Sequence, residues 1–562
     1  MPPNGARKRV RIPRVQLTLA PGATARVLGQ LKRGSVLGRL ALAFVALCAI
    51  WISTRPWLPP FEYHLGYTPA RDVVARVDFS KPNPLLSETD LPTYRQYKAG
   101  DPLASAGKPL KVETLELLRY EYLAYTEKLP LTRQVERGLA VFGMMLVLAV
   151  VCGFALYHRE PRLLARWHRF AVMLLMLTLA VAASVWASQD PWRAELVPLL
   201  VAAMTFGIAY GRELAMVLAF SMALVTAIAV GQSLGEFLML MGVVSAAVLQ
   251  LGRVRSRRKL IGVGFFAGLI ALPLTLGVGL LMDQPLGWPL LSDALRNAMW
   301  TLLAGFLITG LLPFIEGLCG VVTEISLLEL ADVAHPLLQE LVRRAPGTYN
   351  HSINVASLAE AAAEAIGARG LLVRVGAYFH DIGKMLKPAY FVENQAGENS
   401  RHDHLVPAMS TLIIIAHVKD GADLARQHRL PEPIVDFIEQ HHGTTLVEYF
   451  YRRASEQSEQ DGEAAVVPES SFRYPGPKPQ TVEAAVLMLA DAVESAARTL
   501  VEPGSSCIES LVHELAMKRL LDGQFDECGL TLKQLATIED SLSKSLIAMY
   551  HARVKYPEQR TA

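Results

Sequence analysis

Eight uncharged apolar runs fill most of the first 320 residues, and they constrain the fold more than any other feature of this sequence. The runs occupy residues 40–54, 139–156, 170–188, 196–211, 214–230, 237–252, 260–282 and 297–315. A helix that crosses a bilayer needs about 17–25 apolar residues, and flanking residues such as Arg39 can extend the shorter runs to that length. One such run is commonly a buried core helix, but eight in succession predict a polytopic membrane protein with eight transmembrane helices, one followed by seven.

The composition supports a membrane protein with a soluble part attached. The chain of 562 residues is 52% hydrophobic and only 19% charged, with a mean hydropathy of +0.28. Soluble globular chains carry about 25% charged residues. The formal net charge of +3 is too small to indicate a nucleic-acid polymer as a partner. The five cysteines have no paired spacing, so neither a disulfide framework nor a zinc ribbon is indicated.

The basic residues predict the orientation of the helices, because short cytoplasmic connections of membrane proteins are enriched in Lys and Arg. Residues 1–36, 157–169 and 253–259 are rich in these residues. The short connections that alternate with them, at 189–195, 231–236 and 283–296, hold only Arg193 and Arg296. We therefore expect both termini in the cytoplasm. No A-x-A-like site follows the first run, so that run is predicted to be an uncleaved anchor.

These patterns divide the chain into six parts. We expect a basic cytoplasmic leader (1–36), a first transmembrane helix (37–54), an outward-facing segment or small domain (55–136), a seven-helix transmembrane domain (137–322), a linker helix (323–345) and an all-helical cytoplasmic domain (346–562). The outward part is either a ligand sensor or a spacer. Residues 455–480 are acidic and polar and then rich in Pro and Gly, which predicts a loop.

The cytoplasmic half contains eleven of the fourteen histidines, and several lie at apolar positions. His441 and His442 follow Ile434 and Phe437 at helical spacing, which puts both imidazoles at the edge of a buried stripe. Asp491 follows residues 484–490, which carry no charge. An isolated ionised carboxylate there would cost several kcal/mol unless it is paired or bound to a metal.

Each of these residues alone has an ordinary explanation, as a core histidine or as an Asp that caps a helix or pairs with Arg498. Seven such residues occur within one region, however: His351, His380, Asp381, His417, His441, His442 and Asp491. Imidazole and carboxylate ligands suit iron, manganese, nickel or zinc. Seven ligands are too many for one catalytic ion that keeps a position open for water, so the set suits a pair of ions.

The same residues lie in motifs that resemble a known family. The strings GTYNHS, YFHDIGK, HVKDG, QHHGTT and LADAVES follow one another here, with ENQ at 393–395, FRYPGPKPQT at 472–481 and YHARVKYP at 550–557. These motifs resemble those of the seven-transmembrane HD hydrolases, a branch of the HD phosphohydrolase superfamily that is typified by a cyclic di-AMP phosphodiesterase. The resemblance covers nearly all of residues 137–557, including the seven helices before the HD domain.

The resemblance implies a bacterial plasma-membrane protein whose all-helical HD domain holds two metal ions, iron or manganese. It implies that His351, His380, Asp381 and Asp491 hold one ion, that His417, His441 and His442 hold the other, and that Asp381 bridges both. Two departures are visible. Asn350 stands where relatives commonly have a second His, and the outward segment is much shorter than the family's usual extracellular domain.

The function implied is hydrolysis of cyclic di-AMP to pApA, with Asp381 and Lys384 as catalytic residues. Lys384 would add a cationic donor to the phosphate; the alternative is a solvated lysine after a helix end. The GYP motif of cyclic di-GMP hydrolases is absent, which favours the adenine dinucleotide. Other functions remain open: a silent nucleotide-binding receiver, an HD hydrolase of cyclic di-GMP, (p)ppGpp or dNTPs, or a transporter with a regulatory tail. The helix at 323–345 transmits a signal sensed through the membrane or outward region, pairs two copies of the chain, or merely connects.

Overall fold

The computed structural model describes residues 34–82, 94–252, 254–395, 400–460, 467–500 and 504–551. The basic leader up to residue 33, Arg253 and residues 552–557 of the closing motif lie outside this part of the chain. The described residues form two compact units. The first contains those up to residue 203 together with 213–246 and 267–304; the second contains 204–212, 247–266 and those from 305 onward.

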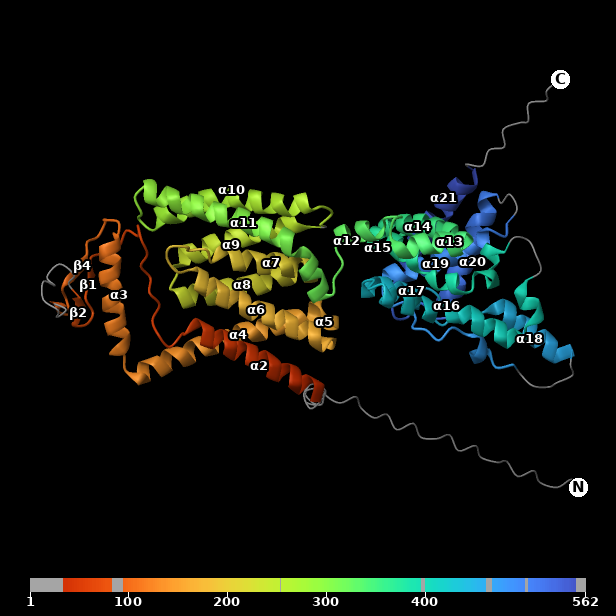
Figure 1. Ribbon diagram of the computed structural model, residues 1–562, viewed down its shortest axis with the longest axis horizontal. Coiled ribbons are helices and arrows are strands. Elements are labelled where there is room, and N and C mark those ends of the chain that lie inside the picture. Colours follow the sequence, from red (N-terminus) through yellow and green to blue (C-terminus); the bar gives the residue numbers. More distant parts are fainter. Residues whose placement is uncertain are drawn as a thin grey trace, which may run out of the picture. The chain divides into compact units, whose positions relative to one another are not determined.

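The fold is that of an all-α membrane protein, as predicted (Figure 1). Among the described residues, seven helices are long and apolar enough to cross a membrane: α2 (Gly34–Thr54), α4 (Leu131–Arg159), α6 (Trp167–Ala187), α8 (Arg212–Val230), α9 (Leu234–Leu251), α10 (Arg257–Leu281) and α11 (Trp288–Cys319). The eighth predicted span is α7 (Leu196–Tyr210), which has only 15 residues. At 1.5 Å per residue it reaches about 22 Å, short of a hydrocarbon core of about 30 Å.

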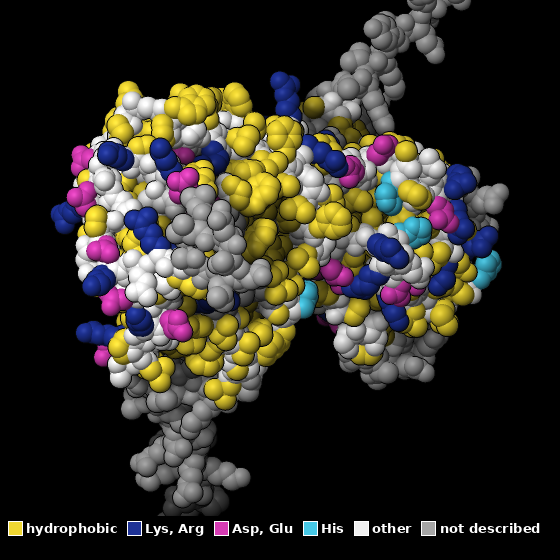
Figure 2. Space-filling view, turned by 60° about the vertical axis from the view of Figure 1, so that its left-hand side comes forward, with side chains coloured by type: hydrophobic (Ala, Val, Ile, Leu, Met, Phe, Trp, Pro, Cys, Tyr) yellow, Lys and Arg dark blue, Asp and Glu magenta, His cyan; other side chains and the backbone are white. Residues whose placement is uncertain are grey.

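The surface of the long helices is apolar, as a lipid-facing surface must be. Figure 2 shows hydrophobic side chains gathered in a broad band, with charged side chains gathered beyond it. Large apolar side chains such as Val147, Phe154 and Phe266 are more than half exposed. Short connections separate the spans. Gly231, which directly follows α8, has a φ of 80°, a backbone conformation that only glycine adopts without strain.

One charged pair lies inside a span, contrary to the sequence analysis. Asp293 and Arg296 were expected in a connection over 283–296, but α11 begins at Trp288 and includes both. Asp293 accepts hydrogen bonds from Arg193 at 3.1 Å and pairs with Arg296 at 2.8 Å. Asp293 therefore has two basic partners, Arg193 from the connection before α7 and Arg296 one turn later in α11.

The outward segment contains a small folded module. Strand β1 (Val73–Val74) pairs antiparallel with β4 (Pro102–Ala104), and β2 (Phe79–Pro82) pairs antiparallel with β3 (Tyr94–Tyr97). Helix α3 (Val112–Glu127) packs against these strands over a core that includes Phe79, Leu103 and Leu118. The buried Glu121 accepts a hydrogen bond from Arg76 at 2.8 Å. The segment is therefore folded.

The cytoplasmic part is built from helices. They are α12 (Glu324–Leu330), α13 (Pro336–Arg344), α14 (Pro346–Ala365), α15 (Gly370–Phe379), α16 (Pro407–Gln427), α17 (Glu432–Gln440), α18 (Glu448–Gln460), α19 (Val482–Ala497), α20 (Ser505–Leu521) and α21 (Leu532–His551). Helix α14 packs against α15, α19 and α21, and α15 also packs against α17. The α19 segment 484–490 is buried throughout, as its uncharged sequence requires.

Two predicted boundaries are wrong. The linker expected as one helix over 323–345 is two helices, α12 and α13, because Pro336 disfavours helical backbone at His335, whose ψ is 129°. The loop expected over 455–480 begins later, since α18 continues to Gln460. Residues 461–466 of that loop lie outside the described chain. Short 3₁₀ helices, η2 (Ile382–Leu386) among them, fill the connection between α15 and α16.

Candidate metal centre

The structure brings all seven predicted ligand residues together in the helical domain. They project from α14 (His351), the end of α15 (His380, Asp381), α16 (His417), the end of α17 (His441, His442) and α19 (Asp491). Their ligand atoms form two groups, each within 4.8 Å: Asp381 with His417, His441 and His442, and His351 with His380 and Asp491. All are buried except His442, which is half-buried with 22% of its side chain exposed.

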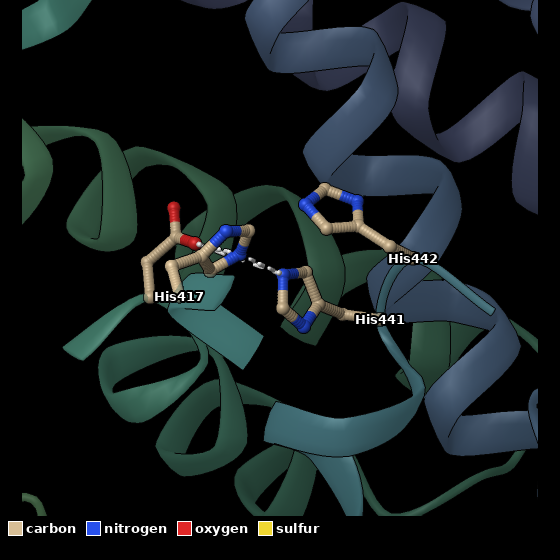
Figure 3. Close-up of side chains that lie close together, drawn as sticks. His417, His441 and His442 are labelled. Carbon is tan, nitrogen blue, oxygen red and sulfur yellow. Dashed lines mark hydrogen bonds and ion pairs between the residues drawn. The ribbon is translucent and has the colours of Figure 1, made fainter. Parts of the chain in front are cut away.

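Figure 3 shows three imidazoles of the first group turned toward a common point. His417 and His441 are joined by a 3.3 Å contact between their Nε2 atoms. His442 lies beside them, its ring 4.0 Å from that of His441 between centroids. His417 lies on the buried face of α16, which continues through Val418 and Ala422. His441 and His442 directly follow the buried residues of α17. Burial of these two helix faces therefore places the imidazoles in the interior.

A glycine after the His-Asp pair allows α16 to approach. A Cβ atom at Gly383 would lie 1.9 Å from the carbonyl oxygen of His417 and 2.6 Å from the backbone nitrogen of Gly421. Both neighbours are backbone atoms, which cannot rotate away. The Asp381 turn and the His417 helix thus meet through Gly383 and Gly421, which places the Asp381 carboxylate next to the α16 histidine.

Backbone carbonyl groups orient three of the imidazoles. In each ring Nδ1 bonds to the carbonyl oxygen three residues earlier, and since a carbonyl only accepts, Nδ1 carries the hydrogen. The pairs are His380 with Ala377 at 2.7 Å, His417 with Ile414 at 2.5 Å and His441 with Ile438 at 2.8 Å. A neutral ring held in this way presents the Nε2 lone pair to the centre, as metal-binding histidines do.

Glu494 orients the fourth imidazole, and the sequence analysis missed it. His351 Nδ1 donates to Glu494 Oε2 at 2.5 Å, and Arg498 Nε lies 3.1 Å from the same oxygen. The Glu494 side chain is buried. Its spacing offered a signal, because Glu494 lies three residues after Asp491 and therefore on the same face of α19.

Asp381 lies between the two groups, with one oxygen toward each. Its Oδ1 is 3.3 Å from His417 Nε2 and 3.6 Å from His441 Nε2. Its Oδ2 is 3.2 Å from His380 Nε2 and 3.5 Å from His351 Nε2. A carboxylate placed in this way has the geometry of a bridging ligand.

Asp491 is the second carboxylate of the centre. Its Oδ1 is 3.0 Å from His351 Nε2 and 3.8 Å from His380 Nε2, and its Oδ2 is 3.8 Å from His442 Nδ1. Burial alone would raise the pKa of Asp491, but the hydrogen bond with His351 and the nearby imidazoles of His380 and His442 hold that pKa well below its usual range. Asp491 is therefore ionised in the interior, as a metal ligand has to be.

The unsatisfied atoms of the centre fit a divalent metal. His380 Nε2 and the Oδ1 atom of Asp381 are buried without a hydrogen-bond partner, a state that costs free energy unless another group compensates it. The two Nε2 lone pairs of His417 and His441, 3.3 Å apart, repel each other unless a cation lies between them. Imidazole and carboxylate are the ligands of divalent transition metals, so this buried cluster is suited to bind a divalent metal.

Lys384 is not a solvated lysine. Its side chain is 13% exposed, and Nζ lies 2.7 Å from Asp381 Oδ2 and 2.9 Å from Glu393 Oε1. Burial by itself would lower the pKa of Lys384, but Asp381 and Glu393 raise it above its usual value. Thr348 Oγ1 also donates to Glu393 at 3.1 Å, and Asn394 donates to Thr348 at 2.8 Å. The ENQ motif therefore holds the lysine at the edge of the centre.

Two other features complete the surroundings. Tyr474, from the predicted FRYPGPKPQT motif, is buried with its ring 4.3 Å from the ring of His442 between centroids. The ring centroids of Phe391 and His417 lie 5.8 Å apart. Tyr449, by contrast, is 67% exposed. Asn350 is exposed, whereas the adjacent His351 is buried. The departure at position 350 therefore leaves the cluster intact.

Comparison with known proteins defines the class. Residues 137–323 match the family model described as 7TM receptor with intracellular HD hydrolase, and residues 348–496 match the HD domain. The chain belongs to this family of seven-transmembrane HD hydrolases, which confirms the resemblance stated above. Together with the apolar helices, the match makes it a multi-pass membrane protein.

Particular relatives carry a more specific name. The chain is 42% identical over 326 residues to the cyclic-di-AMP phosphodiesterase PgpH of Bacillus subtilis, covering 58% of this chain and 45% of that protein. It is 42% identical over 329 residues to PgpH of Listeria monocytogenes, covering 58% and 44%. The chain thus spans less than half the length of these relatives. The crystal structure of the L. monocytogenes PgpH HD domain in complex with cyclic-di-AMP is 47% identical, covers 39% of this chain and all of that one, and gives a TM-score of 0.37.

Proposed function

We propose that this protein is a membrane-bound phosphodiesterase that hydrolyses cyclic di-AMP to pApA. One observation carries the proposal: two groups of buried ligands meet at Asp381 in a chain that is 42% identical to two cyclic-di-AMP phosphodiesterases. The absence of a GYP motif after His442 supports an adenine rather than a guanine dinucleotide. Both arguments concern the HD domain, so the experiment below tests the whole chain.

The seven ligand residues would form two metal sites that share Asp381. His351, His380 and Asp491 would hold one divalent ion, His417, His441 and His442 the other, and Asp381 would bridge them. Two such ions supply an activated water and neutralise charge on the phosphate that is cleaved. Ligands of mixed nitrogen and oxygen type support iron or manganese.

Charge supports this assignment. Lys384 is balanced by Glu393, and Arg498 by Glu494. The remaining charges of the centre are the carboxylates of Asp381 and Asp491, since neutral imidazoles add none. Two divalent ions leave the centre with a net positive charge, which matches a substrate with two singly charged phosphodiesters.

The chain's own residues keep this centre in place. Glu494 fixes the ring orientation of His351, and carbonyl groups fix those of His380, His417 and His441. Lys384 Nζ, held between Asp381 and Glu393, donates to a non-bridging phosphate oxygen and stabilises the charge that grows there. The buried position of Lys384 makes this interaction stronger than it would be in water.

We also propose the membrane orientation that the basic connections predict. Both termini lie in the cytoplasm of a bacterial cell, and the HD domain lies on the cytoplasmic side of the plasma membrane. The Arg-rich connections at 157–169 and 254–259 support it. Most apolar residues of α12 and α13 are buried in the core of the cytoplasmic domain. The exposed Leu328, Val333 and Val342 support a homodimer through this linker, with the lipid bilayer as the other partner.

The test is a parallel assay on the full-length protein purified in detergent. Wild type, with manganese or ferrous iron, is incubated separately with cyclic di-AMP, cyclic di-GMP, (p)ppGpp and dNTPs. We expect turnover of cyclic di-AMP to pApA, no turnover in Asp381→Ala or His380→Ala, and normal turnover in His428→Ala, an exposed histidine of the same domain. Binding of cyclic di-AMP without product would instead make the protein a receiver, and hydrolysis of another nucleotide would refute the substrate.

A further inference from the structure

A polar cavity lies in the first unit, whereas the residues of the metal centre belong to the second. It has a volume of about 410 Å³ and is lined by residues from the outward segment, from the end of α6 and the connection after it, and from the ends of α8 and α9. Protein pockets for small molecules measure about 300–1,000 Å³, so the cavity has the size of a small organic ligand and is far larger than a single ion.

The lining carries an excess of negative charge. Its acids are Glu62, Asp190, Glu195 and Glu236, and its bases are Arg119 and Arg193. Arg193 already bonds Asp293 at 3.1 Å on both carboxylate oxygens. Arg119 lies 4.0 Å from Asp190 and pairs with it. Three carboxylates of the lining are thus left without a basic partner within it.

Two acceptors in the cavity wall have no donor. Gln232 Nε2 donates to Glu195 Oε1 at 3.0 Å. Glu195 Oε2 and Gln232 Oε1 are both buried without a hydrogen-bond partner. Burial raises the pKa of Glu195 above its usual value, because no nearby cation fully compensates its charge. Neighbouring acceptors of this kind call for a donor with positive charge.

Aromatic rings complete the lining. Phe61 and Tyr63 line the cavity, and their ring centroids lie 5.7 Å apart in an edge-to-face arrangement. Aromatic faces attract organic ammonium groups and pack against short aliphatic chains. The combination of carboxylates, aromatic rings and volume favours an organic cation over an inorganic one, which would prefer a compact set of oxygen ligands.

We infer that this cavity binds a small organic cation carrying protonated amines, with its ammonium group on Glu195 and Gln232 and its carbon chain against Phe61 and Tyr63. The outward segment is then part of a ligand-binding site. This inference does not depend on the catalytic proposal, because it rests on residues of the other unit.

The test is calorimetric binding of 1,4-diaminobutane to the full-length protein in detergent, without any nucleotide. The neutral probe is 1,4-butanediol, which has the same carbon chain, and magnesium chloride is the inorganic probe. We expect the diamine alone to bind. We expect Glu195→Gln to weaken that binding at least about tenfold, the effect of losing one hydrogen bond to a charged group.

Two further variants keep the test sharp. Glu62→Gln removes the charge of an exposed lining residue, and it should also weaken binding. Glu136→Gln, at a 65% exposed residue outside the lining, should leave binding unchanged. Equal binding of the diol, binding by magnesium alone, or full diamine affinity in both Glu195→Gln and Glu62→Gln would each overturn the inference.

Discussion

Substitution of Gly383 by alanine tests how the two halves of the metal centre are held together. The added Cβ atom would lie 1.9 Å from the carbonyl oxygen of His417, and ordinary contact begins at 3.4 Å. The two backbones would therefore have to separate by about 1.5 Å, the difference between these distances. Overpacking of this kind typically costs about 1–3 kcal/mol of stability, which a folded domain can tolerate.

The separation would be far more damaging to the centre than to the fold. His417 would move with α16 away from Asp381, whereas metal–ligand distances tolerate changes of only about 0.2 Å. We expect the group of His417, His441 and His442 to lose its ion. A misplacement of about 1 Å can cost a hundredfold in rate, so turnover of cyclic di-AMP should fall by at least that factor.

The assay combines metal analysis of the purified protein with turnover of cyclic di-AMP and a thermal unfolding curve. Gly504→Ala is the matched control, since Gly504 lies in the same domain with a φ of −69° and has nothing within 4 Å of an added Cβ. It should behave like wild type. Full metal content and full turnover in Gly383→Ala would refute the argument that this glycine joins the Asp381 turn to α16.

Three further predictions address the surroundings of the centre. Glu494→Gln should lower metal affinity or turnover about 10–100-fold, as is typical when the partner of a metal-binding histidine is changed; a titration with manganese measures it, and unchanged affinity would contradict the role of Glu494. Lys384→Met should lower turnover with little change in metal content, because it removes a donor to the phosphate and no metal ligand; metal loss equal to the loss of turnover would instead indicate a structural role. EDTA should abolish turnover and lower the unfolding temperature, and manganese should restore both; a chelated protein that keeps its turnover would show that no exchangeable metal is required.

The sequence predicted well those features that depend on neighbouring residues. Apolar run length located the spans, and helical spacing placed His441 and His442 beside a buried stripe. The absence of charge over residues 484–490 indicated that the Asp491 carboxylate is paired with another group or bound to a metal. Each of these signals is local, because burial of one helix face determines where its side chains go.

Features that depend on distant residues could not be predicted in this way. Glu494 was not singled out, because its partner His351 lies on α14, far away in sequence. Asp293 and Arg296 were expected in a connection, because Arg193, the second partner of Asp293, is far away in sequence. Pro336 in the sequence already indicated a break before α13. The helical periodicity of the apolar residues on either side was nevertheless taken to predict one continuous helix.

The central claim is that Asp381 bridges two ions, and metal stoichiometry tests it most directly. Wild type and Asp381→Ala are purified without chelator and reloaded with manganese. Mass spectrometry then measures the moles of metal per mole of chain. The account predicts two ions per chain in wild type and loss of both, or nearly both, in the variant. At most one ion in wild type, or two ions retained by Asp381→Ala, would contradict it.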